Sequence, residues 1–279
     1  MTSVSTTVAQ IAAQLGEAGL VSPQAEARTL VCFALDVEPS RLALVDEITD
    51  DQRRVLNRAV AERISGTPLQ HVTGRAFFRT TSVHVGPGVF IPRPETESLA
   101  GWAIEQVRTG HARVVELCAG TGAITLAIAT ESTPEACWAV ELSPQAYAYL
   151  KHNLAGTPVT AVLGDMETAL TDLDGTIDLV VANPPYVPSG QELPADVLHD
   201  PDEALFSGED GLDAIRVVAK VAMRLLKPGG VVGCEHGDDQ AESVRGIFAA
   251  QGFDRIRTVD DLTNRPRFVT AHKPSQNMQ

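Results

Sequence analysis

The hydrophobic positions keep a helical spacing over about the first 75 residues. Apolar side chains there recur every three or four positions, as at Val8, Ile11 and Leu15, which places them on one face of a helix. Strand-like alternation of apolar and polar residues does not occur in this part. The pattern predicts a small helical bundle at residues 1–75.

Two local signals mark where helices of this bundle begin. Ser22 precedes Pro23, a pair that favours an N-cap followed by proline at the first helical position. Thr49 and Gln52 have the spacing of a capping box, in which each side chain binds the backbone N–H of the other residue. Helices are therefore expected to start directly after Ser22 and Thr49.

After the bundle, the period changes to that of β-structure. Residues 77–85 alternate in character and precede a Gly-Pro-Gly turn, which predicts a short β-hairpin linker within residues 76–92. From residue 93 to residue 279, apolar runs of strand length alternate with helical segments, which predicts a largely parallel sheet covered by helices on both faces. The expected strands include residues 114–117, 138–141, 159–163, 177–182 and 230–235.

The most informative motif is Asn183-Pro184-Pro185-Tyr186, which directly follows the apolar run 177–182. The prolines fix φ, donate no N–H and push Asn183 toward an extended conformation, so the turn is stiff. The Asn183 side-chain carbonyl and the Pro184 backbone carbonyl then offer two acceptors to a planar NH2 group, and Tyr186 can cover its flat face. Two such acceptors favour a pyramidal nitrogen, which makes an amide or an exocyclic amine more nucleophilic without a strong base. The alternative interpretation of Asn-Pro-Pro alone is a proline-rich turn that closes a strand.

A glycine-containing turn lies upstream, between the predicted strand 114–117 and a helix that begins at Ala123. It reads Cys118-Ala119-Gly120-Thr121-Gly122, and the order of strand, turn and helix is typical of a nucleotide-binding βα unit. Gly120 and Gly122 allow the backbone to approach a ligand closely. A plain strand-to-helix connection is the alternative interpretation.

Acidic residues end further strands. Glu141 closes the run 138–141, where such folds place the acid that binds a ribose diol, and Asp165 follows the run 159–163, where it can accept from an adenine amine. Each also has a structural interpretation, Glu141 as an acid near a helix start and Asp165 as a turn residue. Glu235, at the end of the run 230–235, is interpreted as structural. The strand ends fall in order on one rim of the predicted sheet, and open α/β sheets bind ligands at that rim.

With these motifs the chain resembles the class I S-adenosylmethionine-dependent methyltransferases, and more narrowly the protein glutamine N5-methyltransferases that modify bacterial peptide chain release factors. The most discriminating segments are residues 66–74 and 89–97, the latter containing the signature-like Ile-Pro-Arg-Pro-Glu-Thr-Glu. Residues 204–212 and 227–235 also match the family pattern. Asn-Pro-Pro-Tyr alone does not single out the family, because DNA and RNA amino-methyltransferases carry it too.

The resemblance implies an α/β fold with a seven-stranded, mostly parallel class I methyltransferase sheet whose last two strands form an antiparallel hairpin. Residues 1–75 would recognise the substrate, residues 76–92 would be the hairpin linker, and residues 93–279 would be the catalytic domain. The implied cofactor is S-adenosylmethionine, with S-adenosylhomocysteine as product and no metal. The cofactor-binding residues would be Pro92, Arg93, Glu116, Cys118, Ala119, Gly120, Thr121, Gly122, Glu141, Leu142, Asp165, Met166 and Asn183.

The implied reaction is direct transfer of the sulfonium methyl group to the side-chain amide nitrogen of the glutamine in a Gly-Gly-Gln loop of a class 1 release factor. Asn183 and the Pro184 carbonyl would hold the two amide N–H groups, while Tyr186 packs against the amide. Catalysis would rest on orientation and electrostatics. Asn183, Pro184 and Tyr186 are thus the expected catalytic residues, and Pro185 joins them in binding the substrate.

The chain departs from the family pattern in the first loop, where the family usually has Asp-x-Gly-x-Gly-x-Gly. Glu116 replaces the acid and Cys118 replaces the first glycine. Cysteine adopts a positive φ less easily than glycine, which makes the conformation of this loop the point to check. Glu141 stands where aspartate is common, and its longer side chain still reaches a diol. Cofactor binding is expected despite these changes.

The net charge of −14 argues against tight, sequence-independent capture of a nucleic-acid backbone, for which a basic face is expected. We therefore expect no stable nucleic-acid partner. Two rival classes remain: an amino-methyltransferase that acts on adenine or guanine in nucleic acid, and a non-catalytic protein that binds S-adenosylmethionine.

The four cysteines are scattered and have no metal-like spacing, as expected for reduced core residues. The start of the chain does not resemble a signal peptide, and no apolar run approaches the roughly 18 residues of a membrane-spanning helix. We expect a cytoplasmic monomer without membrane association.

Overall fold

The computed structural model describes residues 3–194 and 197–275. It forms two compact units, a smaller one within Met1–Arg75 and Pro194–His199 and a larger one within Ala76–Leu193 and Asp200–Gln279. Each unit has an apolar core of its own.

The smaller unit contains the predicted helical bundle, and Ile11 and Leu15 are buried in its core. Helix α2 starts at Pro23 with Ser22 as N-cap, although the Ser22 side chain makes no cap hydrogen bond. At the start of α3, the Gln52 N–H donates to Thr49 Oγ1 (3.2 Å) and the Thr49 N–H donates to Gln52 Oε1 (2.9 Å), which confirms the capping box. The elements are α1 (Val4–Glu17), α2 (Pro23–Leu35), η1 (Pro39–Leu44), α3 (Asp50–Ile64), α4 (Leu69–Thr73) and η3 (Val197–His199).

The predicted hairpin consists of β1 (Arg75–Phe78) and β2 (Thr81–His84), which pair as a two-stranded sheet. Phe78 and Val83 are buried in the same apolar cluster as residues of α5 and α6 in the larger unit. The hairpin is therefore part of the core of that unit.

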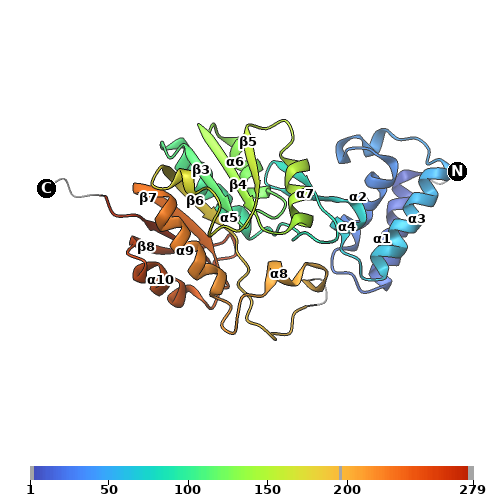
Figure 1. Cartoon of the computed structure of the whole chain (residues 1–279). Coiled ribbons are helices and arrows are strands. Elements are labelled where there is room, and N and C mark those ends of the chain that lie inside the picture. The colour runs from blue at the N-terminus through green and yellow to red at the C-terminus, as the bar shows by residue number, and fades with distance from the viewer. Residues whose placement is uncertain (1–2, 195–196, 276–279) are drawn as a thin grey trace. The chain divides into compact units, whose positions relative to one another are not determined.

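The larger unit is built on a seven-stranded sheet with the order β5-β4-β3-β6-β7-β9-β8 (Figure 1). Strand β9 is antiparallel to both its neighbours, and the other neighbouring pairs are parallel. This arrangement confirms the predicted sheet and its terminal hairpin. The strands are β3 (Arg113–Leu117), β4 (Ala136–Glu141), β5 (Val159–Leu163), β6 (Ile177–Ala182), β7 (Leu226–Glu235), β8 (Asp254–Asp260) and β9 (Pro266–His272).

Strand β7 begins earlier than the predicted strand 230–235. Leu226 already pairs with Ile177 of β6, and the register shifts between Ile177 and Leu179. This shift in register lets β7 contain Pro228. Proline cannot donate a hydrogen bond to the neighbouring strand, and it is tolerated in a strand near a bulge.

Helices cover both faces of the sheet. Helices α5 and α6 pack with Val114, whereas α9 and α10 pack with its neighbour Val115, as the alternation of side chains along a strand requires. No helix of the described residues is long and apolar enough to cross a membrane. The remaining elements of this unit are α5 (Thr96–Arg108), α6 (Ala123–Glu131), α7 (Pro144–Asn153), η2 (Thr171–Leu173), α8 (Asp202–Leu205), α9 (Asp213–Leu225) and α10 (Ala241–Ala250).

Replacing Thr49 with alanine removes the hydroxyl that caps α3. We expect the free energy of opening α3 to fall by about 1 kcal/mol, the usual effect of losing an N-cap side chain. Amide hydrogen exchange in the full chain measures this loss helix by helix. Ser22→Ala is the matched control, because the Ser22 side chain makes no cap hydrogen bond. Equal losses in α2 and α3 would contradict the capping argument.

Candidate active site

The carboxyl ends of β3, β4, β5 and β6 lie on one edge of the sheet because these strands are parallel neighbours. The predicted site residues other than Pro92 and Arg93 lie in the last two residues of these strands or in the segments that follow them. The fold therefore gathers, on one rim, residues that are far apart in the sequence. Chemistry at this rim depends on the contacts of each segment.

The turn after β3 has a positive φ at three positions. Cys118, Gly120 and Gly122 have φ of 56°, 54° and 77°, so the cysteine adopts a left-handed conformation that glycine takes more easily. A Cβ at Gly122 would lie 2.6 Å from Leu150 Cδ1, whereas a Cβ at Gly120 would meet nothing within 4 Å. The turn thus packs closely at Gly122 and leaves space for a ligand beside Gly120.

The two residues between these positions are buried and fix the turn. The Ala119 N–H donates to the Val140 carbonyl (3.0 Å), which ties the turn to β4. The Thr121 carbonyl accepts from Asn153 Nδ2 (3.0 Å), which ties it to α7. The backbone beside Gly120 is therefore held from both sides.

Glu116 and Glu141 are both buried at this turn. Glu116 Oε2 accepts from the Thr125 N–H (2.9 Å), and burial holds the pKa of Glu116 well above its ordinary value. Glu141 accepts from the Gly120 N–H (2.7 Å) and the Ser143 N–H (2.8 Å). Burial raises the pKa of Glu141, and these backbone donors oppose the rise. Glu116 therefore braces the start of α6. Glu141 braces the turn, and each of its oxygens keeps a further lone pair for another donor.

The segment after β5 contacts the turn after β3 through two sulfur atoms. Cys118 Sγ lies 3.9 Å from Met166 Sδ. Burial and the nearby Glu141 raise the pKa of the Cys118 thiol to about 12, so it stays protonated at neutral pH and is a poor nucleophile. Asp165 is exposed and accepts from the Glu167 N–H (2.9 Å), and Leu142 is also exposed.

Asn183 and Pro184 present the two predicted acceptors. Asn183 Nδ2 donates to Thr96 Oγ1 over 3.2 Å, so the nitrogen end of the amide is held at the start of α5 and Oδ1 is the other end. Within residues 3–194 and 197–275, no hydrogen bond is donated to Asn183 Oδ1 or to the Pro184 carbonyl oxygen. Both oxygens therefore keep their acceptor capacity for an NH2 group.

Tyr186 is held by its hydroxyl end and by its backbone. The hydroxyl lies 3.5 Å from Glu235 Oε1, and the carbonyl accepts from Gln240 Nε2 over 2.9 Å. Burial and the Glu235 carboxyl raise the pKa of Tyr186 above its ordinary value. The phenol is thus neutral, and the residue is held at both its hydroxyl and its carbonyl.

Residues 204–212, which matched the family pattern, brace the Asn-Pro-Pro-Tyr turn. The Val187 N–H donates to the Leu205 carbonyl (2.8 Å), and the Ser207 N–H donates to the Val187 carbonyl (2.9 Å). Gly211 has φ of 75°, and a Cβ there would overlap the Tyr186 carbonyl oxygen. Residues 204–212 therefore hold the Asn-Pro-Pro-Tyr turn in place in this chain.

The segment that contains Pro92 and Arg93 is anchored by Asp200, whose side chain is fully buried. Asp200 accepts from the Ile91 N–H (3.0 Å) and from Arg93 Nη2 (2.5 Å). The Arg93 guanidinium also lies 5.3 Å from the centre of the Phe90 ring. This anchoring fixes the chain just before Thr96, the first residue of α5.

Sequence reasoning assigned no site role to Thr96 or Asp200, and it did not show that Glu235 approaches Tyr186. An acid at the end of a parallel strand was the available signal for Glu235, as it was for Glu141. For Asp200 there was none, because it lies 107 residues from its partner Arg93.

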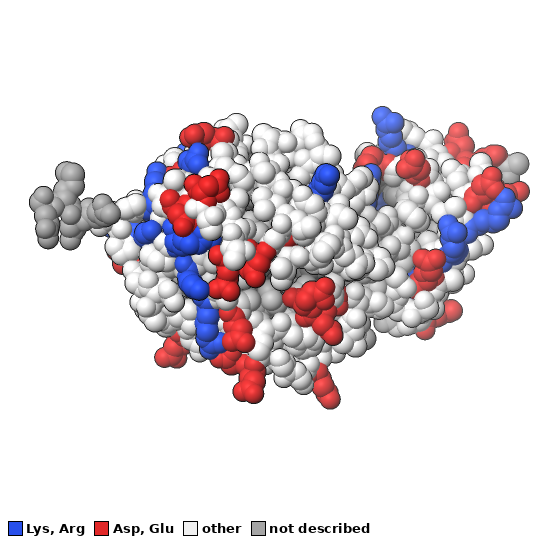
Figure 2. Space-filling view, in the orientation of Figure 1, with Lys and Arg blue, Asp and Glu red and all other residues white. Residues whose placement is uncertain are grey.

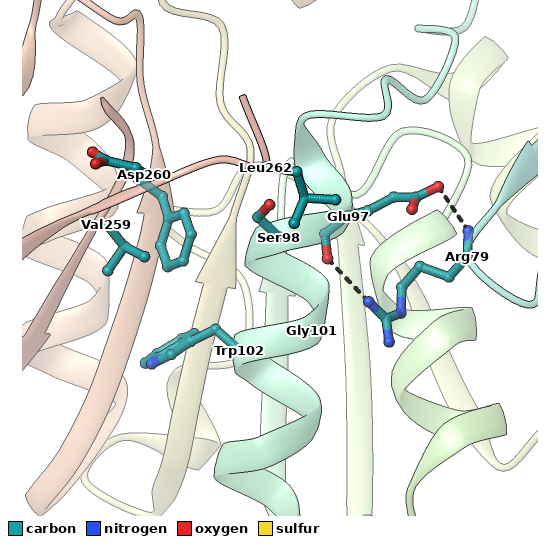
Figure 3. Close-up of a pocket in the computed structure, with 9 residues that line it drawn as sticks. Arg79, Glu97, Ser98, Gly101, Trp102, Val259, Asp260 and Leu262 are labelled. Atoms are coloured by element: carbon teal, nitrogen blue, oxygen red, sulfur yellow. Dashed lines mark hydrogen bonds between the residues drawn. The ribbon is translucent and has the colours of Figure 1, made fainter. Parts of the chain in front are cut away.

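A hollow of about 360 Å³ lies away from these residues, between α5 and the connection of β8 to β9 (Figure 3). Trp102, Phe268 and Leu262 are among its lining residues, and none of the predicted site residues lines it. Arg79 at its edge is already bonded to Glu97 and to Glu131. The hollow is separate from the rim site.

The reversed strand β9 beside six parallel strands, together with the rim site, defines a class I methyltransferase fold. Residues 6–74 match the family model described as the PrmC N-terminal domain, and residues 101–190 match the TRM5/TYW2 methyltransferase domain. A solved structure, the 16S rRNA N2 G1207 methyltransferase of T. thermophilus with AdoMet and guanosine, has the same fold. Its TM-score is 0.51 at 23% identity, over 71% of this chain and 49% of that one.

Two relatives resemble the chain over nearly its whole length. The release factor glutamine methyltransferase of Streptomyces coelicolor is 46% identical, over 95% of this chain and 96% of that protein. The 4-amino-L-phenylalanine/4-methylamino-L-phenylalanine methyltransferase of Streptomyces pristinaespiralis is 38% identical, over 90% of each. The chain belongs to the release factor glutamine methyltransferase family.

Replacing Gly211 with alanine should displace the Tyr186 carbonyl and with it the acceptor turn. We expect the kcat for methyl transfer to fall on the order of 100-fold, since misplacement by about 1 Å has effects of that size. Steady-state kinetics and a binding titration with S-adenosylmethionine measure the change.

Gly246→Ala is the matched control, because a Cβ at this position in α10 meets nothing within 4 Å. It should keep the activity and raise the free energy of unfolding by up to about 1 kcal/mol. Unchanged kcat in Gly211→Ala would show that residues 204–212 do not brace the turn.

Proposed function

We propose that this protein transfers a methyl group from S-adenosylmethionine to the side-chain amide nitrogen of the glutamine in the Gly-Gly-Gln motif of class 1 peptide chain release factors. The observation that carries the proposal is the pair of available oxygens, Asn183 Oδ1 and the Pro184 carbonyl, held at the end of a buried strand. Such a pair fits the two N–H bonds of a primary amide. The 46% identical relative, named for this activity, supports the same substrate.

The rim also fits the cofactor. Gly120 borders open space, Glu141 has spare lone pairs for ribose hydroxyls, and the exposed Asp165 suits the adenine amine. S-adenosylmethionine supplies an electrophilic methyl group on a positively charged sulfonium. We infer that further cofactor contacts come from Cys118, Ala119, Thr121, Gly122, Leu142, Met166, Pro92 and Arg93.

The residues around the amide work by orientation. Asn183 Oδ1 and the Pro184 carbonyl each accept one amide N–H, and Tyr186 packs on the amide plane. This grip turns the nitrogen lone pair toward the methyl group and weakens its delocalisation into the carbonyl. S-adenosylmethionine would supply the methyl group, with its S–C bond breaking as the N–C bond forms, and the nitrogen would then give one proton to water. The proposal assigns the catalytic role to Asn183, Pro184 and Tyr186 and a binding role to Pro185.

A small aromatic amine is the second candidate acceptor. The relative from Streptomyces pristinaespiralis is named for 4-amino-L-phenylalanine, whose planar NH2 group suits the same two oxygens.

The charge of the protein argues against a nucleic-acid substrate. The basic residues of α9 are paired with acids: Arg216 with Asp210 and Asp213, Lys220 with Glu167, and Arg224 with Asp174. The face shown in Figure 2 carries basic side chains among acidic ones.

We further propose that the bundle at residues 1–75 recognises the body of the release factor, with residues 76–92 as linker and residues 93–279 as the catalytic domain. The separate family model for the N-terminal part supports a dedicated role for it. We infer a monomer that acts in the cytoplasm, where translation takes place. Sedimentation of the purified chain tests the monomer.

The function is tested by following radiolabelled methyl transfer to four acceptors in parallel. They are the release factor, the same factor with its Gly-Gly-Gln glutamine replaced, 4-amino-L-phenylalanine, and bulk RNA. Label on the intact factor and on none of the others is the expected result. Label on the small amine or on RNA, with none on the factor, would replace the proposed substrate.

Replacing Asn183 with alanine removes one of the two acceptors. We expect kcat to fall roughly 10²- to 10³-fold, by analogy with the loss of one oxyanion-hole donor, and the Kd for S-adenosylmethionine to change far less, because Asn183 is only one of the expected cofactor contacts. Single-turnover methylation and a cofactor titration give the two numbers. Turnover close to that of the unmodified protein would rule out the assigned role of Asn183.

A further inference from the structure

Asn183 and Glu235 lie on the same face of the sheet, at the ends of neighbouring strands. In the parallel pair β6 and β7, Val181 faces Gly233 and Ala182 faces Cys234, so Asn183 and Glu235 come next. Side chains alternate along a strand, which puts both residues on the face that carries Val181. That face is covered by α5, whose first residue is Thr96.

Gly233 allows α5 to come close to β7. A Cβ at Gly233 would overlap the Trp102 ring of α5. The close packing brings the start of α5 to the ends of both strands, where Thr96 Oγ1 accepts from Asn183 Nδ2. Thr96 is 4% exposed and Glu235 is 1% exposed, so water does not screen the interaction between these two side chains.

Glu235 is a buried carboxyl with few partners. Its Oε1 lies 3.5 Å from the Tyr186 hydroxyl, and its Oε2 has no hydrogen-bond partner in the part of the chain that the structure describes. Burial raises the pKa of Glu235 to about 7, although the Thr96 hydroxyl and Arg267 favour the charged form. Glu235 therefore changes its charge close to neutral pH.

We propose that Thr96 and Glu235 are positioning residues that decide which end of the Asn183 amide faces the substrate. An ionised Glu235 only accepts, so it attracts the single hydroxyl proton of Thr96. Thr96 Oγ1 can then only accept from Asn183, which holds Nδ2 inward and Oδ1 outward. The inference rests on the proposed function, because it concerns the acceptor that grips the substrate amide.

Protonation of Glu235 removes this preference. A neutral carboxyl can donate to Thr96, whose own proton is then free to turn to Asn183. The Asn183 amide can then rotate, so that its NH2 group meets the NH2 group of the substrate and the grip is lost. The orientation of one amide is thus linked to the charge of a carboxyl that touches neither substrate nor cofactor.

The direction of the pH effect follows from the groups around Glu235. Besides Thr96, these are Glu95 at the start of α5, Tyr186 after β6 and Arg267 on β9, while the buried Cys234 precedes it on β7. Arg267 is held in place by Asp261 over 3.1 Å. As pH rises through about 7, Glu235 ionises, so kcat should rise and then level off.

The test uses three variants of the full chain, with kcat, KM and the cofactor Kd measured across pH. Thr96→Val should lower kcat by roughly tenfold or more through lost orientation, with the cofactor Kd unchanged. Thr96→Ser keeps the hydroxyl and should keep both kcat and the pH profile. Glu235→Gln should have a low kcat that no longer rises near pH 7.

Thr270→Val is the control for the loss of a buried threonine hydroxyl elsewhere, since Thr270 on β9 is 8% exposed. It should leave kcat unchanged. An equal loss in Thr270→Val, or an unchanged kcat in Thr96→Val, would overturn the proposal. So would an unchanged pH profile in Glu235→Gln.

A second readout does not depend on the substrate. The side-chain NH2 signals of Asn183 in a nitrogen-15 NMR spectrum should shift with pH near 7 in the unmodified chain and stay fixed in Glu235→Gln. Absence of this shift in the unmodified chain would overturn the inference even if the release factor is methylated. Conversely, if the protein methylates only another amine, the proposed substrate is wrong. The pH-dependent NMR shift of the Asn183 side chain then still tests whether Thr96 and Glu235 orient the Asn183 amide.

Discussion

The site depends on one constraint: the turn from Asn183 to Tyr186 contains two prolines and cannot be held by sheet hydrogen bonds. Its conformation must therefore come from neighbours on every side. Thr96 holds the amide, Gln240 holds the Tyr186 carbonyl, and Gly211 gives that carbonyl room. The stiffness of the prolines keeps the entropy cost of this arrangement low, because few backbone conformations have to be excluded.

The parallel sheet divides the chemistry between two parts of its rim. The ends of β3, β4 and β5 offer close backbone approach and carboxylates that brace it, which suits a nucleoside cofactor. The ends of β6 and β7 offer neutral acceptors over a buried carboxyl, which suits an amide. The thiol of Cys118 and the phenol of Tyr186 both stay protonated, so the rim is built for orientation and has no strong nucleophile of its own.

Much of the fold could be predicted from the sequence because the spacing of hydrophobic residues distinguished helices from strands clearly. The helical spacing before residue 75, the capping box at Thr49 and the apolar runs of the parallel strands all report local structure, and all are confirmed. The early start of β7 was missed, since Pro228 and the two glycines after it indicate a turn unless a bulge in the partner ladder is known. The antiparallel hairpin at the end came from the family resemblance, as periodicity does not report strand direction.

Only the part of the site that directly follows predicted strands could be identified from the sequence. Glycines and acids after apolar runs identified the rim, but their contacts depend on packing between distant segments. Cys118 is an example. A side chain at this position disfavours a positive φ, yet packing of the turn imposes a positive φ on Cys118. Thr96 and Asp200 act through partners 87 and 107 residues away, which no local pattern reveals.

The most direct test of the account is a crystal structure of the chain with S-adenosylhomocysteine and a peptide that contains Gly-Gly-Gln. Asn183 Oδ1 and the Pro184 carbonyl oxygen should each lie about 2.9 Å from the glutamine amide nitrogen, the usual length of an N–H···O bond. The Tyr186 ring should then cover the amide plane. A glutamine amide bound elsewhere on the rim, with either oxygen unused, would contradict the central claim.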